Sequence, residues 1–234
     1  ELRETVDVLC DDDHEVIVLR DFKHFAANRF ESMIGRSERF RAFASEMGKT
    51  RCRIQQTELA HLNPPALKTK SRFMNIEPVI CWAQMVLGVL SDPEADAANV
   101  SDVRKLRDRL GWLEGYRDDI AGWRRCCEVI SWSLSWINTH CLTRNSGETL
   151  CAHLDQLREV RCELSDLLTT KLVEHVWSSA SMLAEGERSW LSSEALESTF
   201  GLFKRREGQQ SRSGFTGLIA TLPTLLRTWT ATEV

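Results

Sequence analysis

Apolar residues recur at helical spacing through most of this 234-residue chain. Between residue 24 and about residue 62, the apolar positions fall three or four residues apart, which is the period of an amphipathic helix. We expect breaks near Gly35 and near Gly48. Pro64-Pro65 ends the run because proline lacks the backbone N–H that a helix needs. The predicted buried face consists of Phe25, Phe30, Ile34, Phe40, Phe43 and Met47.

The same periodicity returns in the second half of the chain. A helix is predicted over about 76–90, and residues 91–101, with Pro93 and several small residues, are typical of a linker. Ser101 is a good N-cap for the next helix, and helical patterns then run to about residue 184 with a break at 145–147. Four tryptophans have the spacing of packed helix faces, which favours the core over a ligand cage. They are Trp112, Trp123, Trp132 and Trp136.

One segment has the pattern of a strand. Residues 15–20 contain Val-Ile-Val-Leu, a β-branched run that is typical of a buried parallel strand. The rest of the sequence contains no second convincing strand. The patterns together therefore predict a mainly α fold with one strand near 15–20.

Asp21 and His24 follow directly after the predicted strand. Side chains at the C-terminal edge of a buried strand point into the crevice where α/β proteins bind ligands. In that position the Asp21 carboxylate suits a divalent metal, and His24 suits a phosphate or a neighbouring carboxylate. The same spacing also allows a structural interpretation, in which Asp21 caps the following helix and His24 packs beneath it.

The last chemically suggestive segment is a helix predicted over 194–206, in which Glu197, Gly201 and Lys204 share one face. Glycine inside a helix costs about 1 kcal/mol relative to alanine. Gly201 therefore indicates close approach of another backbone, a metal or DNA, with tight helix packing as the alternative. Basic residues that could bind phosphates, or form a solvated tail, follow: Lys204, Arg205, Arg206 and Arg212.

Composition narrows the class of protein. The net charge of −4 gives no global basic signature, so contact with DNA must come from local clusters. Eight cysteines form no Cys-x-x-Cys pair, and most lie in apolar helical patterns, which indicates reduced, buried thiols in a cytosolic protein. The spacing of His140, Cys141, Cys151 and His153 resembles that of zinc ligands only weakly. Without a secretory signal or an apolar run of about 18 residues, we expect a cytoplasmic protein with no membrane partner.

Several short motifs occur in order over nearly the whole chain. They are Asp21-Phe22-Lys23-His24, Gln55-Gln56-Thr57-Glu58-Leu59-Ala60, Pro64-Pro65, Arg72-Phe73-Met74-Asn75, Ser193-Glu194-Ala195-Leu196-Glu197-Ser198-Thr199-Phe200-Gly201 and Gln210-Ser211-Arg212-Ser213-Gly214-Phe215-Thr216-Gly217. Each motif alone is weak, but the ordered set resembles bacterial transposase-like proteins of the DDE type. The resemblance implies a ribonuclease H-like α/β core, of which the strand near 15–20 is a remnant. A large helical insertion interrupts that core, as in hAT and Mutator-like enzymes.

The resemblance also implies roles for individual residues. Glu197 matches the last acid of the catalytic triad, with Glu194 as second choice, and Asp21 and His24 match a Cys/Asp-x-x-His motif. Glu197 and Asp21 are then the implied ligands of Mg²⁺ or Mn²⁺, since these hard cations prefer carboxylate oxygens. The implied DNA-binding residues are Lys204, Arg205, Arg206, Arg212, Lys68, Lys70 and Arg72.

Three parts follow from the same resemblance. Residues 1–47 are the core remnant, 48–188 the all-helical insertion, and 189–234 the core helix with the catalytic glutamate and a basic tail. The implied activity is metal-dependent phosphodiester hydrolysis and strand transfer at transposon ends. The implied partners are transposon and target DNA and further copies of the chain, on the nucleoid of a bacterial cytoplasm.

The sequence departs from this family in one respect. Both catalytic aspartates should lie before residue 1, so we expect a C-terminal fragment that is inactive alone. If Asp21 is instead the second catalytic aspartate, the first is still missing. One alternative is a non-catalytic helical protein, derived from a transposase, that binds DNA or a protein partner. Another is a helical domain that binds a small molecule in a tryptophan-lined pocket.

Overall fold

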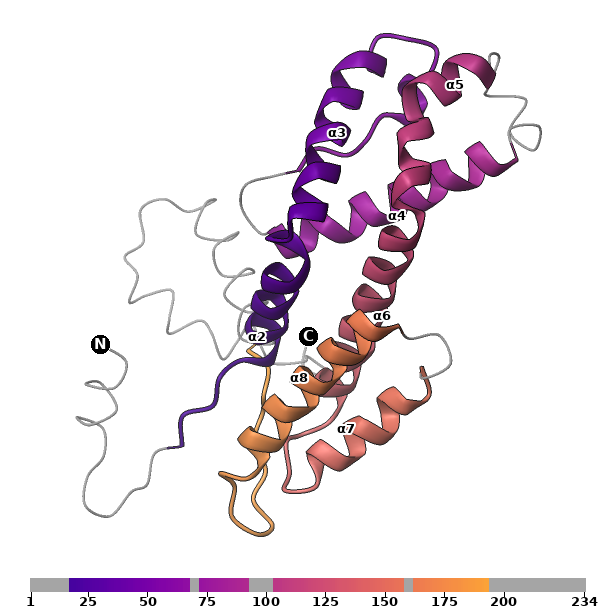
Figure 1. Ribbon diagram of the computed structural model, residues 1–234. Helices are drawn as coiled ribbons and strands as arrows, with labels where there is room; N and C mark the ends of the chain where they lie inside the picture. The colour runs from indigo at the N-terminus through magenta and orange to yellow at the C-terminus, as the bar shows by residue number, and fades with distance from the viewer. Residues whose placement is uncertain (1–16, 68–71, 93–102, 158–161, 194–234) are drawn as a thin grey trace, which may run out of the picture. The chain divides into compact units, whose positions relative to one another are not determined.

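The computed structural model describes residues 17–67, 72–92, 103–157 and 162–193. These residues are mostly helical and contain no strand, which confirms the prediction of a mainly α fold for this part of the chain (Figure 1). The chain divides into two units, Glu1–Leu191 and Ser192–Val234. The first unit holds α2 (Phe22–Phe30), the π-helical η1 (Glu31–Gly35), α3 (Glu38–Ile54), the 3-10 turn η2 (Ala60–Leu62), α4 (Arg72–Ser91), α5 (Val103–Leu110), the 3-10 helix η3 (Gly111–Tyr116), α6 (Arg117–Thr139), α7 (Ser146–Asp155) and α8 (Glu163–Ala180).

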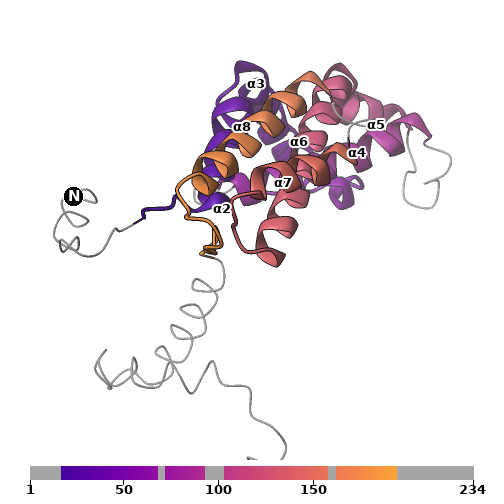
Figure 2. The same ribbon diagram turned by 90° about the horizontal axis from the view of Figure 1, so that it is seen from below.

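Helix α6 is central in this unit. It packs against α4, α7 and α8 and also contacts α2, and Figure 2 shows it lying among the other helices. Its buried side chains include Ile120, Trp123, Val129 and Ile137, which lie on more than one side of the helix. A helix that is apolar on several sides is stable only when neighbours cover those sides, and this explains the position of α6.

The turn between α2 and α3 lies where the sequence predicts a break. Helix η1 ends at Gly35, and the Oγ of Ser37 accepts a hydrogen bond from the Phe40 N–H at 3.1 Å, which caps α3. The predicted break near Gly48 is wrong, because Gly48 lies inside α3. Met47 and Ile54 are buried on either side of it, and their packing outweighs the modest helix penalty of one exposed glycine.

An aromatic cluster joins α3 to η3 and α6. The Phe43 side chain is 0% exposed, and its ring centroid lies 5.2 Å from that of Trp123, 5.4 Å from Tyr116 and 5.5 Å from Trp112. The Trp112 Nε1–H donates to the Oγ1 of Thr50 at 2.9 Å, so the indole nitrogen is satisfied inside the cluster. The predicted core role holds for Trp112, Trp123 and Trp136, whereas Trp132 is 36% exposed.

The predicted strand near 15–20 is not a strand in the residues that the structure describes, 17–20. Ile17 and Leu19 pack against the helical core, while Val18 is 48% exposed. The apolar residues thus alternate as in a strand, but the Arg20 carbonyl accepts from the His175 side chain at 3.1 Å and not from a paired strand. A β-branched run predicts local conformation, whereas a strand also needs a partner for its backbone hydrogen bonds.

Helices α7 and α8 approach closely at a glycine. The Trp177 indole of α8 occupies the space that a Cβ would need at Gly147 in α7, so the glycine makes room for the tryptophan ring between the two helices. The predicted break at 145–147 coincides with the start of α7 at Ser146. The predicted linker, apart from Ser91 and Asp92, lies outside the described residues.

None of the described helices combines the length and apolar composition that a bilayer crossing requires.

Candidate nucleic-acid interface

Asp21 and His24 meet at the start of α2. One oxygen of Asp21, Oδ1, accepts from the backbone N–H of His24 at 2.8 Å and lies 2.9 Å from its Nδ1. Asp21 therefore caps α2, as the structural interpretation of this motif predicts. The His24 side chain is 67% exposed, so it does not pack beneath the helix.

The described residues do not by themselves form a metal site. Of the two implied metal ligands, Asp21 is a described residue, and its Oδ1 already contacts the backbone N–H and the Nδ1 of His24. In residues 17–67, 72–92, 103–157 and 162–193, no three side chains of His, Cys, Asp or Glu are grouped to hold a metal ion. A complete site would need carboxylates from elsewhere, and no catalytic step follows from the residues described.

Most other residues predicted to act on DNA lie outside the described residues. These are Glu194, Glu197, Lys204, Arg205, Arg206, Arg212, Lys68 and Lys70. Arg72 begins α4. The predicted roles of these residues stay predictions.

The exposed side of α3 carries a row of cations. The cations are Arg41, Lys49 and Arg53, which follow a four-residue repeat with Ser45 between the first two. All four side chains are exposed. At 1.5 Å per residue, the row from Arg41 to Arg53 extends about 18 Å along the helix. DNA presents roughly one phosphate charge per 1.7 Å of its axis, so a stretch of duplex as long as this row carries several phosphates.

Helix α5 adds a second group of cations beside α3. Its sequence is Val-Arg-Lys-Leu-Arg-Asp-Arg-Leu, in which only Leu106 and Leu110 are buried. It contacts α3, and Figure 1 shows both helices at the same end of the unit. Lys105 extends from α5 to Glu58, which follows α3, with 2.7 Å between Nζ and Oε1. This hydrogen bond and ion pair lower the pKa of Glu58 and connect the two basic segments.

Some of these cations serve the fold and not a ligand. Arg39 donates to Asp119 Oδ2 at 2.8 Å and lies over the Tyr116 ring at 4.0 Å, so it fixes α3 to η3 and α6. Arg51 donates to the Pro64 carbonyl at 2.7 Å. Arg41, Lys49, Arg53 and Arg107 are exposed, and we define these four cations as the basic face.

The basic face has few competing acids. Among the ion pairs between described residues, Arg41, Arg53 and Arg107 take part in none. Lys49 pairs with Glu46 at 2.6 Å, but both groups are exposed. An exposed pair of this kind contributes roughly 0–1 kcal/mol, so a phosphate can replace the glutamate at little cost.

The opposite end of the unit is acidic. Helix α7 contains Glu148 and Asp155 and no lysine or arginine, and α8 contains three acids and one lysine. A groove of about 900 Å³ between them is lined by Asp155, Asp166, Glu174 and Trp177, among others. Its carboxylates repel phosphate, so a polyanion is expected at the α3–α5 end and not here.

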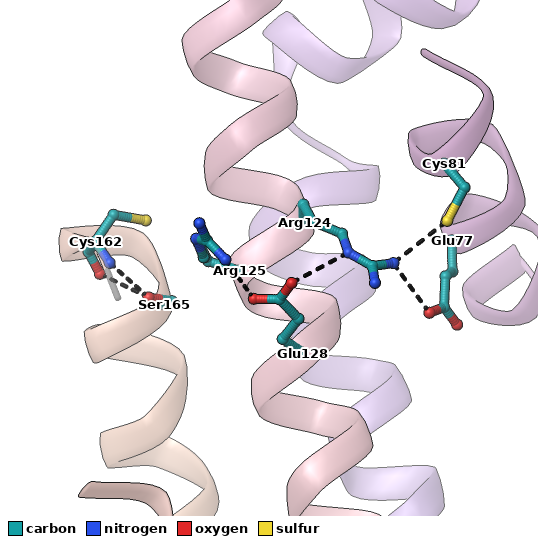
Figure 3. Close-up of polar contacts among 7 residues, drawn as sticks. All are labelled: Glu77, Cys81, Arg124, Arg125, Glu128, Cys162 and Ser165. Carbon is teal, nitrogen blue, oxygen red and sulfur yellow. Dashed lines mark hydrogen bonds and ion pairs between the residues drawn. The ribbon is translucent and has the colours of Figure 1, made fainter. Parts of the chain in front are cut away.

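Between the two ends, Arg124 bridges α4 and α6 (Figure 3). Its Nη1 lies 3.5 Å from the Glu77 Oε1 and 3.3 Å from the Cys81 Sγ, and its Nε donates to Glu128 Oε1 at 3.3 Å. Arg125 donates to the other oxygen of Glu128 at 2.8 Å. These acids compensate both arginines, which therefore belong to the scaffold and not to the basic face.

His175 is expected to make the stability of the unit depend on pH. Its ring stacks on Phe25 with centroids 3.9 Å apart, and burial, together with Arg20 and Arg29, lowers its pKa from the ordinary value. Neutral His175 thus favours the folded state above its unfolded pKa of about 6.5, and this contribution is lost as pH falls through the lower folded pKa. We expect the midpoint of thermal unfolding to fall on acidification below about pH 6.5, with a smaller fall in His175→Gln. Identical pH profiles of the two proteins would contradict this role.

Sequence reasoning missed the basic face. Its residues belong to helices about 50 positions apart in the sequence, and only their packing brings α3 and α5 together. The available signal was the recurrence of cations over 39–53 and 104–109. No protein-family model, curated protein or solved structure matches this chain.

Proposed function

We propose that this chain supplies the helical DNA-binding part of a DDE-type transposase. The observation that supports it is the basic face on α3 and α5, at one end of a unit whose other end is acidic. Cations at that end bind phosphates of double-stranded DNA without reading its sequence. The unequal distribution of charge also orients the unit as it approaches a polyanion.

The wider assignment to a transposase rests on the ordered motifs. In the longer enzyme that they imply, Glu197 is the last catalytic acid and Mg²⁺ or Mn²⁺ the cofactor. Such an enzyme cuts and joins DNA at transposon ends as a homo-oligomer, on the nucleoid of a bacterial cell. A non-catalytic descendant would keep the DNA-binding surface and lose the cleavage, so the basic face serves both possibilities.

Neutralising the basic face is expected to weaken DNA binding about 10- to 100-fold at low salt, because each lost cation removes a phosphate contact. The variant replaces Arg41, Lys49, Arg53 and Arg107 with glutamine, and fluorescence anisotropy of a labelled duplex measures Kd. The four side chains are exposed, so the thermal midpoint should stay close to that of the unmodified chain.

A matched control neutralises a cation at the acidic end. Lys171 on α8 is exposed to a similar degree as Lys49 and likewise pairs with a glutamate three residues away, Glu174. Lys171→Gln is expected to leave Kd within about twofold, whereas Lys49→Gln alone should raise it measurably. An unchanged Kd in the four-residue variant, or an equal loss in Lys171→Gln, would show that DNA does not bind at the basic face.

A further inference from the structure

Two cysteines lie near each other where α8 begins beside α6. Cys126 lies in α6 and is 0% exposed, and Cys162 is the N-cap residue of α8. Gly122 precedes Cys126 by one helical turn, and a Cβ placed on it would lie 3.7 Å from the Cys162 Sγ. Because residues four apart share a helix face, Gly122 and Cys126 are adjoining positions on the side of α6 that Cys162 touches. Figure 3 shows the Cys162 side chain pointing from α8 toward α6.

The two thiols differ in accessibility. Cys162 is partly exposed and lines a cavity of about 490 Å³ with Gly122, Arg125 and Leu164, whereas Cys126 lies behind it in the core. A small reagent that enters this cavity therefore meets Cys162 first. Burial raises the pKa of Cys126 to about 12, with a further contribution from Cys162, so the Cys126 thiol is protonated at neutral pH.

The neighbouring Cys127 provides an internal comparison. It is buried too, but its thiol lies near Glu77 and Cys81 of α4, on the other side of α6. The side of α6 that faces α8 thus has its own pair of thiols. Cys126 and Cys127 are adjacent in sequence yet belong to different helix–helix contacts.

We propose that Cys126 and Cys162 form a redox-sensitive pair that a low-molecular-weight disulfide converts into a covalent link between α6 and α8. The Cys162 thiolate attacks one sulfur of the reagent, which forms a mixed disulfide and releases one reagent thiolate. Cys126 then loses its proton to solvent and attacks the Cys162 sulfur, which releases the second reagent thiolate. The two protein thiols are oxidised, and the reagent disulfide is reduced to two thiols.

The link should stabilise the fold. It closes a loop of about 35 residues, and restricting a loop of that length in the unfolded chain raises the midpoint of thermal unfolding by roughly 5–10 °C. The start of α8, which packs on α6 and α7, would then no longer separate from α6. This effect concerns the stability of the unit and is independent of DNA binding.

The experiment treats the full chain with oxidised glutathione, blocks the remaining thiols with an alkylating agent, and maps the disulfides by peptide mass spectrometry. We expect a peptide that joins Cys126 to Cys162, together with the higher thermal midpoint, which returns to its starting value on reduction. Glutathione on Cys162 with Cys126 still alkylated after unfolding would overturn the proposal. This readout uses the unmodified chain and does not depend on a variant that must fold.

Two matched variants locate the second thiol. Cys126→Ser should keep glutathione on Cys162 and give no internal link, whereas Cys127→Ser should still form it. A link that persists in Cys126→Ser and disappears in Cys127→Ser would assign the pairing to Cys127 and overturn the proposal.

Discussion

Replacing Phe43 by alanine is expected to lower the free energy of unfolding by about 3–5 kcal/mol, the usual cost of removing a fully buried phenylalanine ring. Phe43 is 0% exposed and contacts three aromatic rings, Trp112, Tyr116 and Trp123, that come from two other elements. The cavity left by the ring cannot close without moving η3 or α6. Urea unfolding followed by tryptophan fluorescence and circular dichroism measures the loss.

A control distinguishes this loss from a general sensitivity to truncation. Met85 lies in α4 and is among the exposed large apolar residues, so Met85→Ala should cost less than about 1 kcal/mol. A loss below about 1 kcal/mol for Phe43→Ala as well would mean that the aromatic cluster does not hold α3 against α6.

Glu197→Gln is expected to reduce strand cleavage by the longer enzyme at least about 10³-fold while binding to transposon ends survives. Glutamine keeps the shape of the side chain but removes the negative charge that the last acid of the catalytic triad requires. Glu197 lies outside the described residues, so this expectation follows from the ordered motifs alone. Cleavage of a labelled transposon-end duplex and its binding are measured on the same preparation.

The second choice for the catalytic acid supplies the control. Glu194 lies three residues before Glu197 in the same motif. Glu194→Gln should leave cleavage within a few-fold of the unmodified enzyme. Undiminished cleavage by Glu197→Gln would show that Glu197 is not the catalytic acid. A loss of cleavage in Glu194→Gln alone would assign that role to Glu194.

Helical periodicity predicted much of the fold because a helix with one buried face has apolar residues every three or four positions. The face from Phe25 to Met47 is buried as expected, and the break near Gly35 coincides with η1. The predictions from sequence were wrong where contacts with other elements determine the local structure. The run at 17–20 packs on helices and pairs with no strand among the described residues. Gly48 stays helical because buried residues on both sides of it hold α3 in place.

The candidate site was less predictable from sequence. Asp21 and His24 could be paired from their spacing, but only the structure shows that the aspartate caps α2 while the histidine ring is exposed. Cation counts along the sequence also do not separate the arginines that hold the fold, such as Arg39 and Arg51, from those that remain accessible. That division depends on which carbonyls, carboxylates and rings the folding brings near each guanidinium.

The salt dependence of DNA binding tests the central claim most directly. For the full chain, the logarithm of the association constant should fall linearly with the logarithm of salt concentration, with a slope of about −0.9 per phosphate contacted. The variant with glutamine at Arg41, Lys49, Arg53 and Arg107 should show a slope shallower by about 3.6, one phosphate contact for each lost cation, while Lys171→Gln keeps the slope of the unmodified chain. Equal slopes for all three proteins would contradict the proposal that α3 and α5 bind the DNA backbone.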